Sequence, residues 1–222
     1  MITVMSLWRN DEERHLQDRV VHLLSKRSFL DVRWLWVVGD STDGTERFLR
    51  DVASLNPAIT VIRHDSGMPD SGNVVERRRR SAWTASRMFE EIPLDAEYVC
   101  LHESDLRSPD DVLDRLLTVS ANEPVAAWPV INLNGTPQFY DIWAFRFLNG
   151  TQFSPFMTRP KRPFEVGSFG SCWIAPADFV RGRQLDETAI VGLCQRWRME
   201  GIRMWADPRT IVEQPTSLWV CS

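Results

Sequence analysis

The chain has 222 residues, of which 43% are hydrophobic, and its 30 acidic and 26 basic side chains give a net charge of −4. A chain of this length buries roughly 70% of its unfolded surface, which is enough for one substantial core. The charge balance gives no general attraction to nucleic acid or to an anionic membrane. No apolar run approaches the roughly 18 residues of a membrane-spanning helix, so no transmembrane anchor is predicted.

The compartment is inferred from the first residues and from the cysteines. The start, MITVMSLWRNDEERH, lacks the basic leader of a secretory signal. The four cysteines form no CxxC pair, which argues against a zinc site. Cys100 lies in an apolar run and is expected to be a buried thiol. These features favour a reducing, cytoplasmic localisation.

Short apolar runs alternate with helical patterns over the first half of the chain. Strands are expected at residues 2–7, 33–38, 58–63 and 97–102. Each is followed by a helical pattern of apolar side chains. We expect Asn10 or Asp11 to cap the first helix, Asn73 to begin the third, and Ser108 to be the N-cap of the fourth.

The second half opens with one more apolar strand, VAAWPVINL, and continues with Gly- and Pro-rich loops. Residues 176–201 read as mainly helical, and one or two short strands close the chain. The alternation predicts an α/β fold with a single Rossmann-like, mostly parallel sheet and helices on both faces. We expect one domain, with residues 1–123 binding a nucleotide and a smaller region, 124–222, shaping a second substrate site.

Two polar clusters follow strands of this predicted sheet. GDSTDGT (39–45) comes after the second strand, and Glu103, Ser104 and Asp105 come after the fourth. Ligands of an open α/β sheet bind at these strand ends. Glu103 and Asp105 stand two residues apart, so in extended backbone they point the same way. Converging carboxylates suit Mg²⁺ or Mn²⁺, whose remaining ligands are often water and substrate phosphates.

Four arginines, Arg77 to Arg80, occupy the start of the third predicted helix. Four successive helical residues cannot share one face, so two or more are expected to be solvated or salt-bridged. One or two could reach a phosphate, which arginine binds in bidentate fashion.

These clusters resemble those of family 2-like glycosyltransferases with the GT-A fold. VVGDSTDGT resembles their DDGSTDGT turn, and CLHESDLRSPDDVLDRL resembles their DxD segment. The resemblance implies a UDP- or GDP-sugar donor and a Mn²⁺ or Mg²⁺ cofactor. It assigns the nucleotide sugar to Asp40, Asp43, Arg77, Arg78, Glu103 and Ser104, and the metal to Asp105, Glu103 and Glu213. Whether Glu103 or only Asp105 touches the metal stays open.

The chain departs from this family in several places. Val38 and Gly39 replace an Asp pair, and Ala189 and Ile190 stand where an ED motif would supply a catalytic base. No His follows His102, so Glu213 or water would take the position of the family's late metal-binding His.

The second half resembles fungal capsule-associated α-1,3-mannosyltransferases instead. The similar blocks are FYDIWAFR, VGSFGSCWIAPADF and GIRMWADPRTIV. This resemblance implies retention of anomeric configuration. It makes Asp141 the first candidate catalytic acid, with a structural pairing to Arg146 as the alternative. Glu187 is the second candidate base.

The sequence therefore predicts a hexosyl- or pentosyltransferase that moves a sugar from a nucleoside diphosphate to a hydroxyl acceptor, a glycan or polysaccharide by default. A phage-type DNA glycosyltransferase acting on hydroxymethylated bases stays an alternative, because TRPKRP (158–163) and the arginine run could follow a phosphate backbone. An inactive nucleotide-sugar-binding relative is a further alternative. A nucleotidyltransferase is disfavoured because the loop LWRNDEER contains no glycine.

Overall fold

The computed structural model describes residues 1–10, 13–68 and 73–215. The first half contains β1 (Ile2–Trp8), α1 (Glu13–Leu24), β2 (Val32–Val38), α2 (Thr45–Leu55), β3 (Ile59–Arg63), α3 (Val74–Glu90), β4 (Tyr98–His102) and α4 (Val112–Leu117). The second half contains β5 (Val125–Leu133), β6 (Thr136–Phe139), β7 (Phe164–Glu165), β8 (Cys172–Pro176), a 3₁₀ turn (Ala177–Phe179), α5 (Ala189–Met199) and β9 (Trp205–Gln214).

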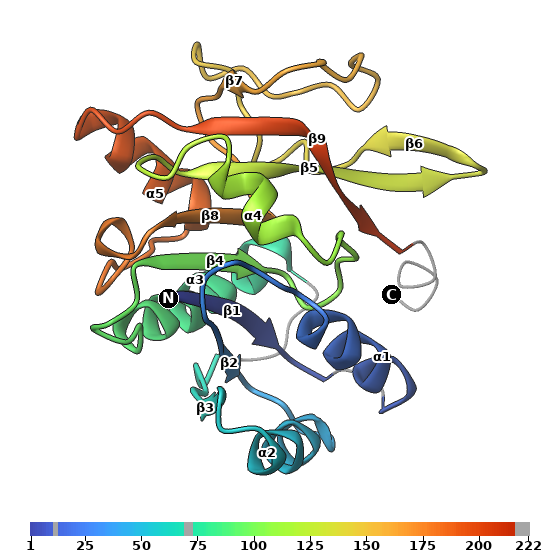
Figure 1. Ribbon diagram of the computed structural model, residues 1–222, viewed down its shortest axis with the longest axis vertical. Coiled ribbons are helices and arrows are strands. Elements are labelled where there is room, and N and C mark those ends of the chain that lie inside the picture. Colours follow the sequence, from blue (N-terminus) through green and yellow to red (C-terminus); the bar gives the residue numbers. More distant parts are fainter. Residues whose placement is uncertain (11–12, 69–72, 216–222) are drawn as a thin grey trace.

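All the strands belong to one sheet (Figure 1), in the order β3-β2-β1-β4-β8-β5-β9-β7, with β6 paired to β5. The pairings of β1 with β2 and β4, of β2 with β3, and of β5 with β9 are parallel. Strand β8 is antiparallel to both β4 and β5, so β5 and β9 run in the same direction as β1. The predicted single, mostly parallel sheet is confirmed.

Side chains alternate between two helix-covered faces, as strand geometry requires. In β1, Met5 packs in the core beneath α3 and α5, whereas Val4 packs in the core beneath α4 and Trp8 in the core beneath α1 and α2. Cys100 is buried and free, as predicted. None of the helices in the described part of the chain has both the length and the apolar character needed to cross a membrane.

Strand β8 joins the two halves of the chain. It comes from the second half, yet it inserts between β4 and β5 and pairs along its length with β4, from Tyr98 opposite Pro176 to His102 opposite Cys172. The loop before β8 therefore lies beside the loop after β4. This antiparallel insertion decides which side chains meet at the carboxyl ends of the parallel strands.

Three local predictions have different outcomes. The start of α3 is confirmed, since the side chain of Asn73 accepts a hydrogen bond from Val75 N at 2.9 Å. Ser108 is not the N-cap of α4; that position belongs to Asp111, because two histidines hold the Ser108 side chain and backbone N–H. Residues 176–201 are helical only at the 3₁₀ turn and in α5, with an irregular stretch between them that contains Gly182 at a positive φ of 69°.

The predicted cap of the first helix falls partly outside the described residues, which exclude Asp11. Asn10 lies three residues before the first residue of α1 and has a positive φ of 46°. Its side-chain oxygen accepts a hydrogen bond from Thr42 N at 2.8 Å, so it contacts the turn after β2.

Candidate active site

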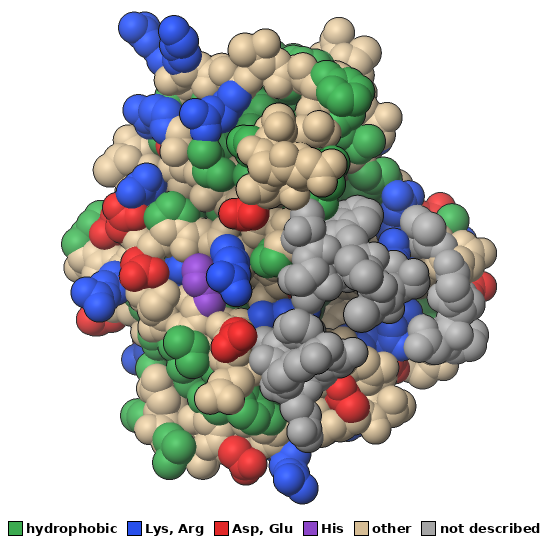
Figure 2. All heavy atoms as spheres, turned by 90° about the vertical axis from the view of Figure 1, so that its right-hand side faces the viewer, with side chains coloured by type: hydrophobic (Ala, Val, Ile, Leu, Met, Phe, Trp, Pro, Cys, Tyr) green, Lys and Arg blue, Asp and Glu red, His purple; other side chains and the backbone are tan. Residues whose placement is uncertain are grey.

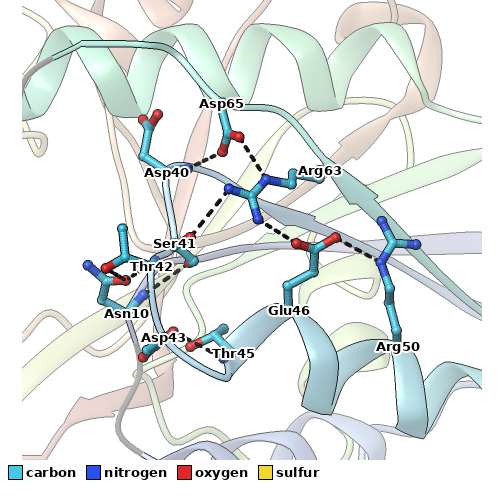
Figure 3. A network of polar contacts seen from close by, with 10 residues as sticks. All are labelled: Asn10, Asp40, Ser41, Thr42, Asp43, Thr45, Glu46, Arg50, Arg63 and Asp65. Carbon is cyan, nitrogen blue, oxygen red and sulfur yellow. Dashed lines mark hydrogen bonds and ion pairs between the residues drawn. The ribbon is translucent and has the colours of Figure 1, made fainter.

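The turn after β2 is held by a network of charged and polar side chains (Figure 3). Asp40 has a positive φ of 52°, and its backbone N–H donates to Asp65 Oδ1 at 2.7 Å. Arg63 Nε fixes Asp65 by a 2.7 Å ion pair. The Asp40 carboxylate accepts hydrogen bonds from Ser66 N at 3.0 Å, Ser66 Oγ at 2.6 Å and Gly67 N at 3.2 Å. The predicted base- or ribose-binding carboxylate thus binds the loop after β3 in this structure.

The other end of the turn is tied to the end of β1. Asn10 N donates to Ser41 Oγ at 3.2 Å. Asp43 accepts a 3.0 Å hydrogen bond from Thr45 N at the start of α2 (Figure 3), so its carboxylate is used within the turn. The start of GDSTDGT is therefore bound to the segments that follow β1 and β3, and Asp43 is bound within the turn, so the turn is preorganised.

Three predicted site carboxylates, Glu103, Asp105 and Asp141, come together beyond the carboxyl end of β4. Glu103 is exposed to solvent by surface area, but protein surrounds it closely enough to disfavour its charged form. The pKa of its carboxyl lies well above the ordinary value because of this desolvation, and then because of the nearby negative charges of Asp105 and Asp141. Burial also raises the pKa of Asp141, although hydrogen bonds from Ser171 and from Ala144 N oppose the rise.

Two hydroxyl groups connect Glu103 with Asp141, and the sequence did not single them out. Ser171 Oγ donates to Asp141 Oδ2 at 2.6 Å and lies 3.1 Å from the Tyr140 hydroxyl. Tyr140 also hydrogen-bonds to Glu103. This bond by itself lowers the pKa of the Glu103 carboxyl, but desolvation and the neighbouring negative charges raise it by more. This row of hydrogen bonds has three contacts, Glu103 to Tyr140, Tyr140 to Ser171 and Ser171 to Asp141, but the two hydroxyl groups supply only two protons. A proton on either carboxyl group would supply the third. The raised pKa values of both carboxyls favour that state.

The backbone before β8 is shaped to fit Asp141. Ser171 has a positive φ of 62°, which is uncommon for a residue other than glycine. A Cβ at Gly170 would lie 2.6 Å from Asp141 Oδ2 and 2.7 Å from Ala144 Cβ, so only glycine fits there without displacement. Arg146, the alternative partner considered for Asp141, donates from Nη1 to Gly150 O instead.

Asp105 lies beside the end of β9. Gln214 Nε2 donates to Asp105 Oδ2 at 2.6 Å. Arg19 on α1 is also near Asp105: burial lowers the pKa of Arg19, and the negative charge of Asp105 opposes that effect. Glu213 exchanges backbone hydrogen bonds of 2.8 and 2.7 Å with Arg107. Because side chains alternate along β9, Glu213 and Gln214 point to opposite faces of the strand.

The site is compatible with a divalent cation of the Mg²⁺ or Mn²⁺ type. Glu103 and Asp105 offer carboxylate oxygens, and the crowding of negative charge around Glu103 is what a cation would relieve. Within the described residues, no group of three or more His, Cys, Asp or Glu side chains is arranged to hold a metal. Such a site would depend on water and substrate phosphate for its other ligands, as Mg²⁺ sites often do.

Neutral histidines support the loop that carries these carboxylates. Ser108 N donates to His22 Nε2 at 2.8 Å, and Ser108 Oγ lies 2.8 Å from His102 Nε2. Burial lowers the pKa of His22 to about 4 and that of His102 to about 3, so both rings accept hydrogen bonds as neutral imidazoles. Buried Lys26 donates to Ser108 O at 2.8 Å. The network fixes the far end of the loop that begins at Glu103.

The arginines of α3 have separate environments. Arg77 is exposed, and Arg78 lies with its Cζ 4.2 Å from the centre of the Trp143 ring. Arg79 forms a 2.7 Å ion pair with Glu187, the second predicted catalytic residue. The Arg78–Trp143 stack brings the start of α3 next to the loop of Asp141.

The fold is that of GT-A glycosyltransferases. The chain is similar in structure to GalNAc-T7 with UDP, GalNAc and Mn²⁺, with a TM-score of 0.64 and 11% identity over 97% of this chain and 44% of the other. It is also similar to the mannosyltransferase PcManGT from Pyrobaculum calidifontis in complex with GDP-Man and Mn²⁺, with a TM-score of 0.63 and 14% identity over 96% of this chain and 56% of the other. The chain therefore spans about half the length of these structures. No family model and no curated protein matches the sequence.

Proposed function

We propose that the protein is a metal-dependent glycosyltransferase that uses a nucleoside-diphosphate sugar. The observation that carries the proposal is the convergence of Glu103, Asp105 and Asp141 at the carboxyl ends of the parallel strands of a GT-A sheet. This is where open α/β sheets bind their ligands. The two similar structures bind UDP or GDP-Man together with Mn²⁺, which supports a nucleotide and a metal in this fold.

In this proposal the turn after β2 contacts the nucleoside, with Asp40 on the base or ribose and Asp43 supporting the turn. Asp40 would have to exchange its hydrogen bonds to Ser66 and Gly67 for the nucleoside. Arg77 and Arg78 lie near the start of α3, beside the site, and are assigned to the diphosphate, where the helix dipole also favours an anion.

Glu103, Ser104 and Asp105 are assigned to the donor and its cation, with Asp105 as the surer ligand and Glu213 as a further candidate. A bound Mn²⁺ or Mg²⁺ would neutralise charge on the departing diphosphate. The opposite orientation of Glu213 and Gln214 makes Gln214 the side chain of β9 that reaches Asp105 directly.

Asp141 is the proposed catalytic carboxyl on the acceptor side. Its raised pKa moves it toward neutrality, which suits exchange of a proton with a hydroxyl group. Glu187 is the weaker candidate, because its carboxylate is engaged by Arg79. The acceptor is proposed to be a glycan hydroxyl. Retention of configuration, as in capsule-associated mannosyltransferases, is part of the proposal.

A donor screen tests the proposal. The chain is incubated with a panel of UDP- and GDP-sugars with and without Mn²⁺, and both the melting temperature and release of the nucleoside diphosphate are measured. We expect one nucleotide to raise the melting temperature only with Mn²⁺, and its sugar derivative to be turned over. Binding without release for every donor would identify an inactive nucleotide-sugar-binding relative. If no donor binds and none releases its nucleoside diphosphate, the proposed function is excluded.

A further inference from the structure

The loop region that follows Asp141 has a charge opposite to that of the rest of the protein. Residues 142–163, called here the basic–apolar segment, contain Arg146, Arg159, Lys161 and Arg162 and no acidic residue. The segment's charge of +4 within a total of −4 leaves −8 for the rest of the chain. It connects β6 to β7 and begins directly beside the candidate active site.

The same segment exposes large apolar side chains. The exposed fractions are 81% for Phe156, 47% for Leu148, 41% for Ile142 and 38% for Phe147. Phe156 lies three residues before Arg159, so its ring and the cations of TRPKRP are close along the chain. In Figure 2, basic side chains gather beside hydrophobic ones at the upper end of the molecule, where the loops around β7 lie in Figure 1.

The cations at the end of the segment are available to a partner. Arg159, Lys161 and Arg162 are exposed, and none of them forms an ion pair with another described residue. Many arginines elsewhere are neutralised locally, such as Arg203, which pairs with Glu165 just beyond the segment at 3.2 Å. Another exposed cation, Arg198, donates to Leu148 O at 3.0 Å and adds to the positive charge at this end.

We propose that the basic–apolar segment docks the protein on an anionic lipid surface, with Phe156 and Leu148 entering the interface and Arg159, Lys161 and Arg162 contacting the headgroups. Exposed apolar side chains flanked by cations bind such interfaces through both effects. Leu148 and Ile142 have no flat face for stacking on bases, so their exposure favours hydrocarbon over nucleic acid. A polyanion lying along the protein would also meet its acidic remainder, whereas a membrane meets only the protruding segment.

Vesicle co-sedimentation of the full chain tests the inference, and it needs neither donor nor metal. Vesicles of phosphatidylglycerol mixed with phosphatidylcholine are compared with pure phosphatidylcholine at low and physiological salt. We expect binding to the mixed vesicles and much weaker binding to pure phosphatidylcholine. Added salt should weaken binding, because it screens the charges on the exposed cations.

Two variants separate the contributions. Phe156→Ser should weaken vesicle binding about tenfold through lost apolar burial. The triple variant Arg159→Gln, Lys161→Gln, Arg162→Gln should weaken it on the order of a hundredfold. Leu94→Ser and Arg47→Gln are matched controls, since Leu94 is 89% exposed and Arg47 is exposed, and both lie outside the segment. Unchanged melting temperatures would show that all the variants fold.

Three outcomes would overturn the inference. One is the absence of sedimentation with mixed vesicles at low salt. Another is that the segment variants and the control variants reduce vesicle binding by the same factor. The third is that duplex DNA, or a second copy of the chain seen by light scattering, binds this segment while vesicles do not. Donor turnover is measured in parallel, so a failure of the lipid inference is distinguishable from a failure of the proposed function.

Discussion

Ser171 Oγ donates a 2.6 Å hydrogen bond to Asp141 Oδ2, although Ser171 itself adopts a positive φ of 62°. A left-handed conformation costs a residue with a side chain about 1–2 kcal/mol relative to glycine. The hydroxyl of Ser171 is thus held in place at the expense of backbone strain. The same hydroxyl contacts Tyr140, which bonds to Glu103, so it connects the Asp141 carboxyl with the Glu103 carboxyl.

Replacing Ser171 separates the role of the hydroxyl from that of the backbone. Ser171→Ala and Ser171→Gly both remove the hydrogen bond to Asp141, so both should lower kcat by about tenfold. The free energy of unfolding of Ser171→Gly should exceed that of Ser171→Ala by about 1 kcal/mol, because glycine relieves the strained backbone. Urea unfolding and donor turnover measure the two effects. Equal kcat values for both variants and the natural chain would show that the hydroxyl does not serve the reaction.

Asp105→Asn should abolish metal-dependent donor turnover while the fold is retained. The substitution removes the negative charge that would bind the cation but keeps the side-chain size near Gln214. Mn²⁺ titration of turnover and the melting temperature are the measurements. The matched control is Asp111→Asn, whose carboxylate is exposed and pairs with Arg115. Activity that survives Asp105→Asn at ordinary Mn²⁺ concentrations would refute the assignment of Asp105.

Gly170→Ala should damage both stability and activity. The new Cβ would lie 2.6 Å from Asp141 Oδ2 and 2.7 Å from Ala144 Cβ, so Asp141 or the loop must move. Overpacking of this kind costs about 1–3 kcal/mol. In a double-mutant cycle with Asp141→Ala, which removes one of the two obstructing groups, Gly170→Ala should cost less. Additive losses of unfolding free energy would show that the Asp141 carboxylate does not set the cost.

His22 should make stability depend on pH. Its folded-state pKa of about 4 lies below the ordinary value of 6.5, since burial and the nearby charges of Lys26 and Arg107 disfavour the imidazolium. The unfolded chain therefore binds a proton first as the pH falls, so stability is complete above about 6.5 and declines toward 4. The decline from this residue is on the order of 1–3 kcal/mol.

His22→Gln isolates this contribution, because glutamine can still accept the hydrogen bond from Ser108 N without titrating. Unfolding free energies of the variant and the natural chain should differ in slope between pH 4 and 6.5. Identical slopes in that window would mean that His22 is already protonated in the folded state or has the same pKa in both states. Buried His102, whose pKa is lowered to about 3, contributes to the slope that remains in the variant.

Much of the first half was predictable because its signals are local. Alternating apolar residues gave the strands that became β1 to β4, and the polar residues that end β2 and β4 located GDSTDGT and Glu103 to Asp105 at one edge of the sheet. The start of α3 follows from the Asn73 side chain, which accepts a hydrogen bond from the backbone N–H of Val75, two residues later. Such features depend on neighbours in the sequence, so composition and spacing are enough to infer them.

The sequence by itself determined the alternation of strands and helices along the first half, the acidic strand end and the acid-free stretch after Asp141. Only the tertiary structure decided that Asp141 meets Glu103 through Tyr140 and Ser171, and that Gln214 reaches Asp105. These contacts depend on β8 inserting antiparallel between β4 and β5, and on β9 closing beside them. The packing of side chains far apart in the chain selects that arrangement, and no local pattern of residues encodes it.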